Sequence, residues 1–235
     1  MSITTVLFDL DGTLLPMDQD EFVHAYFKLL AKKMAPLGYD PQALLGNILK
    51  GIEAMVKNAG SYNNEEAFWR VFDEVYGKEV RKDIPVFEDF YKNEFQQVQT
   101  VCGFNPQAAE IIAHVKEKGL RVALATNPLF PSIATHSRIR WAGLKPEDFE
   151  LVTTYENSGH CKPNPEYYRD ILAEMEVKPE ECLMVGNDVT EDMIAESLGM
   201  KVFLLTDCLI NKEEKDISVY PHGNFSQLSA FIDTL

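Results

Sequence analysis

Apolar and polar residues change their spacing along the chain, and these changes predict its secondary structure. After Asn105, segments with helical spacing alternate with short apolar runs. We expect helices near 106–118, 131–142, 165–176, 190–198 and 225–234, and strands near 120–125, 150–154, 182–185 and 201–205. With Val6-Leu7-Phe8 as a first strand, this order predicts an α/β fold, a Rossmann-like parallel sheet core with helices on both faces.

Between the first strand and Asn105 the spacing is helical throughout. Apolar residues recur at helical intervals over 22–34 and 86–98, with two further helices expected near 41–57 and 64–77. The polar segment 58–64 between these two helices has turn chemistry. The pattern therefore predicts two domains: a core made of residues 1–15 and 104–235, and an all-helical cap inserted after the first strand over residues 16–103.

Two carboxylates stand where the first strand ends, at Asp9 and Asp11, followed by Gly12. Alternation along a strand would place both side chains on the same side as the chain leaves the sheet. Buried carboxylates this close repel each other unless a cation or strong donors compensate, which indicates a metal site or a catalytic site. The alternative is a strand end whose turn uses Asp and Gly for backbone reasons.

Polar side chains also follow the later core strands. Thr126-Asn127 stands before a helix, where hydroxyl and backbone N–H groups bind phosphate well, and Lys162 precedes Pro163 in a segment fixed by two prolines. Gly186-Asn187-Asp188 follows the fourth strand, and Asp192 lies four residues after Asp188, on the same face if the segment is helical. Each feature alone has a plainer explanation as a helix cap or a surface lysine. Their conjunction at the carboxyl ends of parallel strands predicts one shared site.

Charge narrows the classes of partner. The 235 residues carry a formal net charge of −15, which disfavours nucleic acid and anionic membranes as partners. A phosphorylated substrate would be repelled as well, unless a divalent cation and a lysine reverse the field locally. No apolar stretch approaches the roughly 20 residues of a membrane span. The four cysteines form no C-x-x-C pair and read as reduced thiols, so we expect a cytoplasmic protein.

The chain resembles the haloacid dehalogenase-like hydrolase superfamily. The motifs that carry the resemblance are Asp9-Leu10-Asp11-Gly12-Thr13, Thr126-Asn127, Lys162-Pro163-Asn164-Pro165, and Gly186-Asn187-Asp188 with Asp192. The resemblance implies that Asp9 is the nucleophile and forms an aspartyl-phosphate, and that Asp11 protonates the leaving oxygen and then activates water. It implies further that Thr126, Asn127 and Lys162 hold the phosphoryl group, and that Mg²⁺ is the cofactor. The implied metal ligands are Asp9, Asp11, Asn187, Asp188 and Asp192.

One departure from the family pattern concerns the metal. Members commonly have Gly-Asp where this chain has Gly186-Asn187, so we expect metal contact from Asn187, Asp188 or both. Such a set of oxygen ligands without His or Cys suits Mg²⁺.

The expected function is Mg²⁺-dependent hydrolysis of small phosphate monoesters. Asp11 favours phosphate esters over halides, because a departing halide needs no proton. The partner would be a small phosphorylated metabolite, and the protein a monomer or homodimer. One alternative is a sugar phosphomutase, whose cap would need polar and basic groups such as those near 58–64 and Arg70. The other is a non-catalytic phosphate sensor, although a binding module has no use for an acid/base at Asp11.

Overall fold

A parallel sheet forms the centre of the protein in a computed structural model, which describes residues 2–235. Over this range the sheet has six strands in the order β3-β2-β1-β4-β5-β6. Their bounds are β1 Thr5–Phe8, β2 Arg121–Leu124, β3 Leu151–Val152, β4 Cys182–Gly186, β5 Lys201–Leu205 and β6 His222–Gly223. The chain first adds strands on one side of β1 and then continues with β4 on the other side. This reversal of direction at β1 opens a crevice at the carboxyl ends of β1, β2 and β4.

Helices cover both faces of the sheet because alternate strand residues point to opposite sides. Val6 and Phe8 pack in one apolar core, whereas Leu7 packs in a second one. The first core includes residues of α5 (Gln107–Glu117), α6 (Ser132–Trp141) and α8 (Phe225–Ile232). The second core includes residues of α7 (Pro165–Glu174) and of the 3₁₀ helix Met193–Leu198. The predicted fold class is therefore confirmed.

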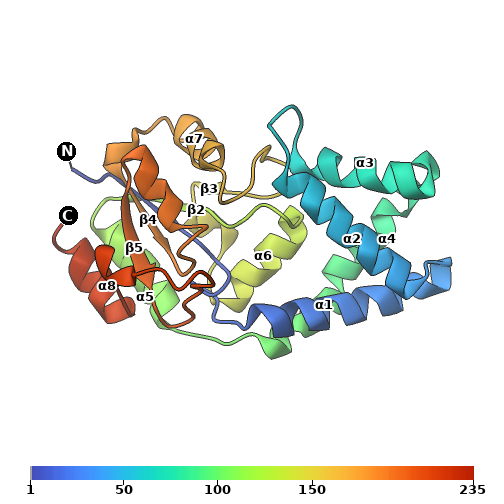
Figure 1. The fold of residues 1–235 in the computed structure, drawn as a ribbon. Helices are drawn as coiled ribbons and strands as arrows, with labels where there is room; N and C mark the ends of the chain where they lie inside the picture. Colours follow the sequence, from blue (N-terminus) through green and yellow to red (C-terminus); the bar gives the residue numbers. More distant parts are fainter. Residues whose placement is uncertain (1) are drawn as a thin grey trace.

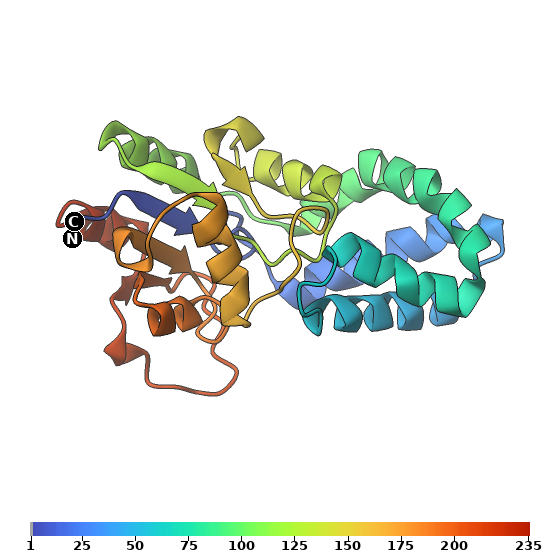
Figure 2. The same ribbon diagram turned by 90° about the horizontal axis from the view of Figure 1, so that it is seen from above.

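The segment between β1 and α5 is helical and lies at the end of the molecule opposite both chain termini (Figures 1 and 2). We call residues 16–103 the helical insert; it contains α1 (Gln19–Met34), α2 (Pro41–Val56), α3 (Asn64–Tyr76) and α4 (Ile84–Lys92). Three of these helices begin at a residue whose side chain accepts a backbone N–H: Asp18, Asp40 and Asn63. Short 3₁₀ helices cover Ala35–Leu37, Lys78–Asp83 and Glu94–Val101 in the insert, and Pro146–Asp148, Pro179–Glu181 and Ile217–Val219 elsewhere.

Two helix predictions were wrong in part because Asn and Asp side chains compete for backbone groups. The helix expected over 86–98 breaks at Asn93, whose side-chain amide donates to the backbone carbonyl of Asp89, and continues as the 3₁₀ helix Glu94–Val101. The helix expected from 190 begins only at Met193, because Asp188 Oδ1 accepts the backbone N–H groups of Thr190 and Glu191 in a turn. Asp188 and Asp192 thus do not share a helix face.

All five predicted strands are present, although the strand expected over 150–154 is reduced to Leu151–Val152. The sixth strand, β6, was not predicted. Across residues 2–235 there is no helix both long and apolar enough to cross a membrane.

Candidate active site

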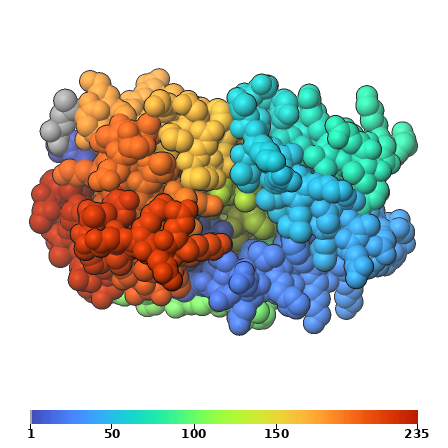
Figure 3. All heavy atoms as spheres, in the orientation of Figure 1, coloured from blue at the N-terminus to red at the C-terminus, as the bar shows by residue number. Residues whose placement is uncertain are grey.

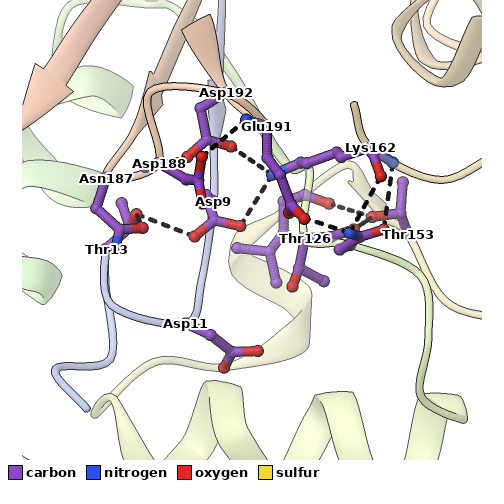
Figure 4. Close-up of polar contacts among 12 residues, drawn as sticks. Asp9, Asp11, Thr13, Thr126, Thr153, Lys162, Asn187, Asp188, Glu191 and Asp192 are labelled. Atoms are coloured by element: carbon purple, nitrogen blue, oxygen red, sulfur yellow. Dashed lines mark hydrogen bonds and ion pairs between the residues drawn. The ribbon is translucent and has the colours of Figure 1, made fainter. Parts of the chain in front are cut away.

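Lys162 is the centre of a buried charge cluster at the carboxyl ends of the strands (Figure 4). Its Nζ lies 2.9 Å from Asp9 Oδ1, directly after β1, and 2.6 Å from Asp192 Oδ1, beyond β4. Lys162 and Asp192 are each 1% exposed and Asp9 is 7% exposed. Burial alone would lower the pKa of Lys162, but the carboxylates of Asp192 and Asp9 raise it well above its ordinary value. The ammonium therefore stays charged.

Asp9 is held on its other side by Thr13. The Thr13 hydroxyl lies 3.0 Å from Asp9 Oδ2 and 2.9 Å from Asn187 Oδ1, so its single proton can be donated to either oxygen. Gly12 makes this approach possible: it has φ +85°, and a Cβ there would lie 2.3 Å from Asn187 Nδ2. Thr13 belonged to the sequence motif but was not predicted as a site residue.

The loop after β4 folds back on itself. Asp192 Oδ2 accepts the backbone N–H of Asp188 at 2.9 Å, and a Cβ on Gly186 would lie only 2.1 Å from the same oxygen. Burial and the nearby charge of Asp9 raise the pKa of Asp192 to about 7, while Lys162 opposes the shift. Burial is the largest cause, and the single ammonium that Asp9 and Asp192 share does not fully offset it.

Asn127 connects the end of β2 to both neighbouring loops. Its Oδ1 accepts the backbone N–H of Lys162 at 3.2 Å, and its Nδ2 donates to Glu191 Oε2 at 3.0 Å. Glu191 was not predicted from the sequence; burial raises its pKa to about 7. The preceding residue, Thr126, is buried, and its backbone carbonyl accepts hydroxyl hydrogen bonds from Thr153 and Tyr167. Thr126 and Asn127 thus stand beside Lys162, as expected from the strand order.

Asp11 does not join this cluster. Figure 4 shows its carboxylate turned away from Asp9 toward α6, where it forms an ion pair with Arg138. The expectation that Asp9 and Asp11 point to the same side was wrong because β1 ends at Phe8 and the chain then turns, with the N–H of Leu15 donating to the carbonyl of Leu10. Strand alternation does not extend into that turn.

Arg138 is a buried charged residue beside the site that the sequence reasoning missed. It is 1% exposed, donates to the Thr135 hydroxyl at 3.2 Å and lies over the Phe130 ring at 4.5 Å. Burial raises the pKa of Asp11, an effect that the charge of Arg138 opposes. The sequence did contain a signal for the burial of Arg138. On a helix, position 138 lies on the face between Ile139 and Trp141, so burial of these two apolar residues also buries Arg138 and leaves Arg140 on the opposite face.

The side chains with ligand oxygens do not form a preformed metal centre in the part of the chain that the structure describes. Within the described range, 2–235, no group of three or more His, Cys, Asp or Glu side chains is arranged to hold an ion. Oxygens of Asp9, Asp188 and Asn187 nevertheless come from adjacent loops after β1 and β4 (Figure 4). Counted as ionised, Asp9, Asp188 and Asp192 carry three negative charges against the single positive charge of Lys162. An all-oxygen set with an excess of negative charge fits Mg²⁺.

Comparisons with known proteins give curated relatives and solved structures with the same fold. A curated relative, the pyrophosphatase PpaX of Bacillus cereus, is 25% identical over 203 residues, which cover 86% of this chain and 82% of the relative. Two solved structures share the fold. CbbY from Rhodobacter sphaeroides in complex with phosphate has a TM-score of 0.60 and 19% identity, covering 99% of this chain and 100% of that one. YfnB from Bacillus subtilis bound to magnesium has a TM-score of 0.55 and 18% identity, with the same coverage of 99% and 100%.

A family model supplies the assignment. The model of the haloacid dehalogenase-like hydrolase matches residues 3–196, which include all four predicted motifs. The match confirms the predicted family and the prediction of a hydrolase, and the names of the relatives agree with the expected phosphatase class. The chain belongs to the haloacid dehalogenase-like hydrolase family.

Proposed function

We propose that this protein is a Mg²⁺-dependent phosphatase that hydrolyses small phosphate monoesters through an aspartyl-phosphate on Asp9. The observation that carries the proposal is the setting of Asp9. This carboxylate is buried at the switch point of the sheet, fixed by Lys162 on one oxygen and by Thr13 on the other. A carboxylate held in one orientation beside a permanent cation is suited to attack a phosphorus atom in line.

The reaction would proceed in two displacements at phosphorus. In the first, a carboxylate oxygen of Asp9 forms a bond to phosphorus while the ester P–O bond breaks, and the departing alkoxide takes a proton from Asp11. In the second, water attacks the phosphorus of the aspartyl-phosphate, its proton passes to Asp11, and inorganic phosphate leaves with Asp9 restored. Lys162 and the Thr126 hydroxyl would neutralise and orient the transferring oxygens, which is the main requirement of phosphoryl transfer.

Asp11 must change partner for this role. It is paired with Arg138 in the structure and would have to rotate toward Asp9 to reach the ester oxygen. The pairing supports a resting state in which the carboxylate of Asp11 is bound to Arg138 and is not in position to transfer a proton.

Mg²⁺ would be held by Asp9, Asp188 and Asn187, whereas the carboxylate of Asp11, also predicted as a ligand, is paired with Arg138. When bound, the ion supplies positive charge that offsets the charge of the phosphoryl oxygens. Asp192 would serve mainly to position Lys162, since one of its oxygens lies 2.6 Å from Nζ and the other accepts the Asp188 N–H.

The helical insert would act as a cap over the site, with segments 14–19 and 100–105 as its connections to the core. The groups near 58–64 that could have served a mutase have other uses. Asn58 donates to Asn64, Asn64 donates to the carbonyl of Pro128, and Arg70 pairs with Glu66. Asn64 thus joins the insert to the core, and Asn58 and Arg70 are engaged within the insert. These contacts do not support a sugar bisphosphate site.

Release of phosphate from para-nitrophenyl phosphate tests the proposal. We expect turnover with Mg²⁺, none in EDTA, and none for Asp9→Asn, which keeps the shape but removes the nucleophile. Asp20→Asn is the matched control, because Asp20 is an exposed aspartate on α1. Absence of turnover on any phosphate ester by the wild-type protein would instead favour a phosphate sensor. The covalent intermediate is tested separately by a mass increase of one phosphoryl group on acid-quenched wild-type protein and its absence in Asp9→Asn.

A further inference from the structure

A pocket of about 270 Å³ extends from the candidate active site into the space between the core and the helical insert. It shares Asp11, Asn127 and Glu191 with the candidate active site, which we call its inner end, and its walls come from α1, α2 and the loop after β2. Figure 3 shows a hollow on this side of the molecule, where orange segments of the core face the blue helices of the insert. A volume near 150 Å³ suffices for benzene, so the pocket has room for a ring and its linker.

The walls of this pocket are apolar. The residues that form them are mostly aromatic or aliphatic: Met17, Phe22, Val23, Phe27, Leu49 and Phe130. Tyr26 adds another ring, and its hydroxyl is already hydrogen-bonded to the Tyr91 hydroxyl at 2.9 Å. Gln19 is the one polar side chain on the outer walls among the lining residues that the structure describes.

Positive charge is missing from the pocket. Among residues 2–235, those that line it include no Lys, Arg or His, whereas Asp11 and Glu191 place two carboxyl groups at its inner end. Arg138 lies behind this wall, 1% exposed and stacked on the Phe130 ring, with its charge directed to Asp11. A second phosphate or a carboxylate in the pocket would therefore lose its hydration beside carboxyl groups and gain no cation.

We propose that this pocket receives the alcohol part of the substrate and selects phosphate monoesters whose alcohol is uncharged and apolar, of about benzyl size. This inference rests on the proposed function and deepens it. The position carries the argument, because the pocket opens beside the residues that follow β1 and β2, where the ester oxygen must lie if Asp9 attacks phosphorus. The same composition disfavours inorganic pyrophosphate and sugar bisphosphates, in which a second phosphate would have to enter the pocket.

Esters of primary alcohols provide the direct test, since their leaving groups have similar basicity. We expect kcat/KM for benzyl phosphate to exceed the value for glycerol phosphate by at least about tenfold, because burial of a phenyl group in an apolar site contributes a factor on the order of ten to a hundred. Equal rates, or a preference for glycerol phosphate, would overturn the pocket assignment and leave the phosphatase proposal intact.

A charge placed on the wall should alter this selectivity. Val23 is 41% exposed on α1 and lines the pocket, so Val23→Lys should fold normally while lowering kcat/KM for benzyl phosphate and raising it for pyrophosphate. Val75 is 45% exposed on α3 and does not line the pocket, so Val75→Lys is the matched control and should leave both values unchanged. A ratio of the two rates that is the same in wild type, Val23→Lys and Val75→Lys would contradict the proposal.

Measurements of binding distinguish a failure of this inference from a failure of the proposed function. With Mg²⁺ present, calorimetry should give a Kd for benzylphosphonate at least about tenfold lower than for 2-hydroxyethylphosphonate, and Val23→Lys should reduce that difference. Selective binding without turnover of any ester would refute the phosphatase and retain the apolar pocket. Binding of the two phosphonates with equal affinity would refute the pocket assignment, whatever the enzyme hydrolyses.

Discussion

Replacement of Lys162 by methionine removes the cation on which two buried carboxylates depend. Asp9 and Asp192 lie 2.9 and 2.6 Å from Nζ, and Lys162 and Asp192 are each 1% exposed. Removing one partner of a buried ion pair destabilises a protein by about 3–5 kcal/mol, because the remaining charge keeps its desolvation cost without its attraction. For a chain of this length each kcal/mol lowers the midpoint of thermal unfolding by about 2–4 °C, so Lys162→Met should lower it by about 6–20 °C.

The measurement is urea and thermal unfolding followed by circular dichroism at pH 7.5 in EDTA, so that bound metal does not contribute. Lys33→Met is the matched control: Lys33 also contacts two carboxylates, Asp89 at 2.5 Å and Glu94 at 2.9 Å, but with 20% of its side chain exposed. Solvent screens such pairs, so its loss should destabilise the protein far less. Similar unfolding midpoints for the two variants would refute the claim that burial makes the ion pairs of Lys162 contribute more to stability than those of Lys33.

A second substitution distinguishes charge from packing. If uncompensated charge causes the loss, Asp192→Asn in the Lys162→Met background should recover part of the stability, since a neutral amide needs no cation. Asp192→Asn alone, with the lysine present, should gain nothing. Failure of the double variant to recover any stability would show that the lysine stem, through its packing, accounts for the effect.

Two further predictions concern the same loops. Gly186→Ala places a Cβ only 2.1 Å from Asp192 Oδ2, so the carboxylate must move. Phosphatase activity should therefore fall by about 10²-fold. Gly46→Ala is the control: a Cβ there has no atom within 4 Å, so activity should stay unchanged. Glu191 has a folded-state pKa raised from 4.5 to about 7, so its contribution to stability is present below its unfolded pKa and is lost as the pH rises through about 7. In EDTA, the unfolding free energy of Glu191→Gln should therefore fall less than that of the wild type between pH 4.5 and 8. The same change in unfolding free energy with pH in both proteins would contradict the raised pKa of Glu191.

Convergence of the candidate site was predictable because it depends on the order of strands. An alternating sequence of helices and strands requires a parallel sheet, and parallel strands bring their carboxyl ends to one edge. Asp9, Asn127, Lys162 and Asp192 follow four successive core strands, and hydrogen bonds to Lys162 join the other three there. Helix starts were also predictable where a side chain caps the first turn, as Asn63 does for α3.

The details that sequence did not predict depend on local hydrogen bonds or on single packing choices. Asn93 and Asp188 bind backbone groups and interrupt helices that apolar spacing alone would extend. The strand β6 has two residues, too few to show an alternating pattern. The partner of the Asp11 carboxylate, Arg138, lies 127 positions away in the chain, and no local pattern encodes a contact at that separation.

The pairing of Asp11 with Arg138 is incomplete, and this bears on how an acid/base can leave its partner. Asp11 Oδ1 and Arg138 Nε are both buried without a hydrogen-bond partner, although Nη1 meets Oδ2. Each buried polar atom left unpaired costs about 1–3 kcal/mol, so the observed position of Asp11 is less stable than a fully satisfied bidentate pair would be. A carboxylate paired bidentately with a buried guanidinium would lose more hydrogen-bond energy on leaving it. In the mechanism proposed above, the unpaired atoms therefore lower the cost of rotating Asp11 from Arg138 toward the ester oxygen.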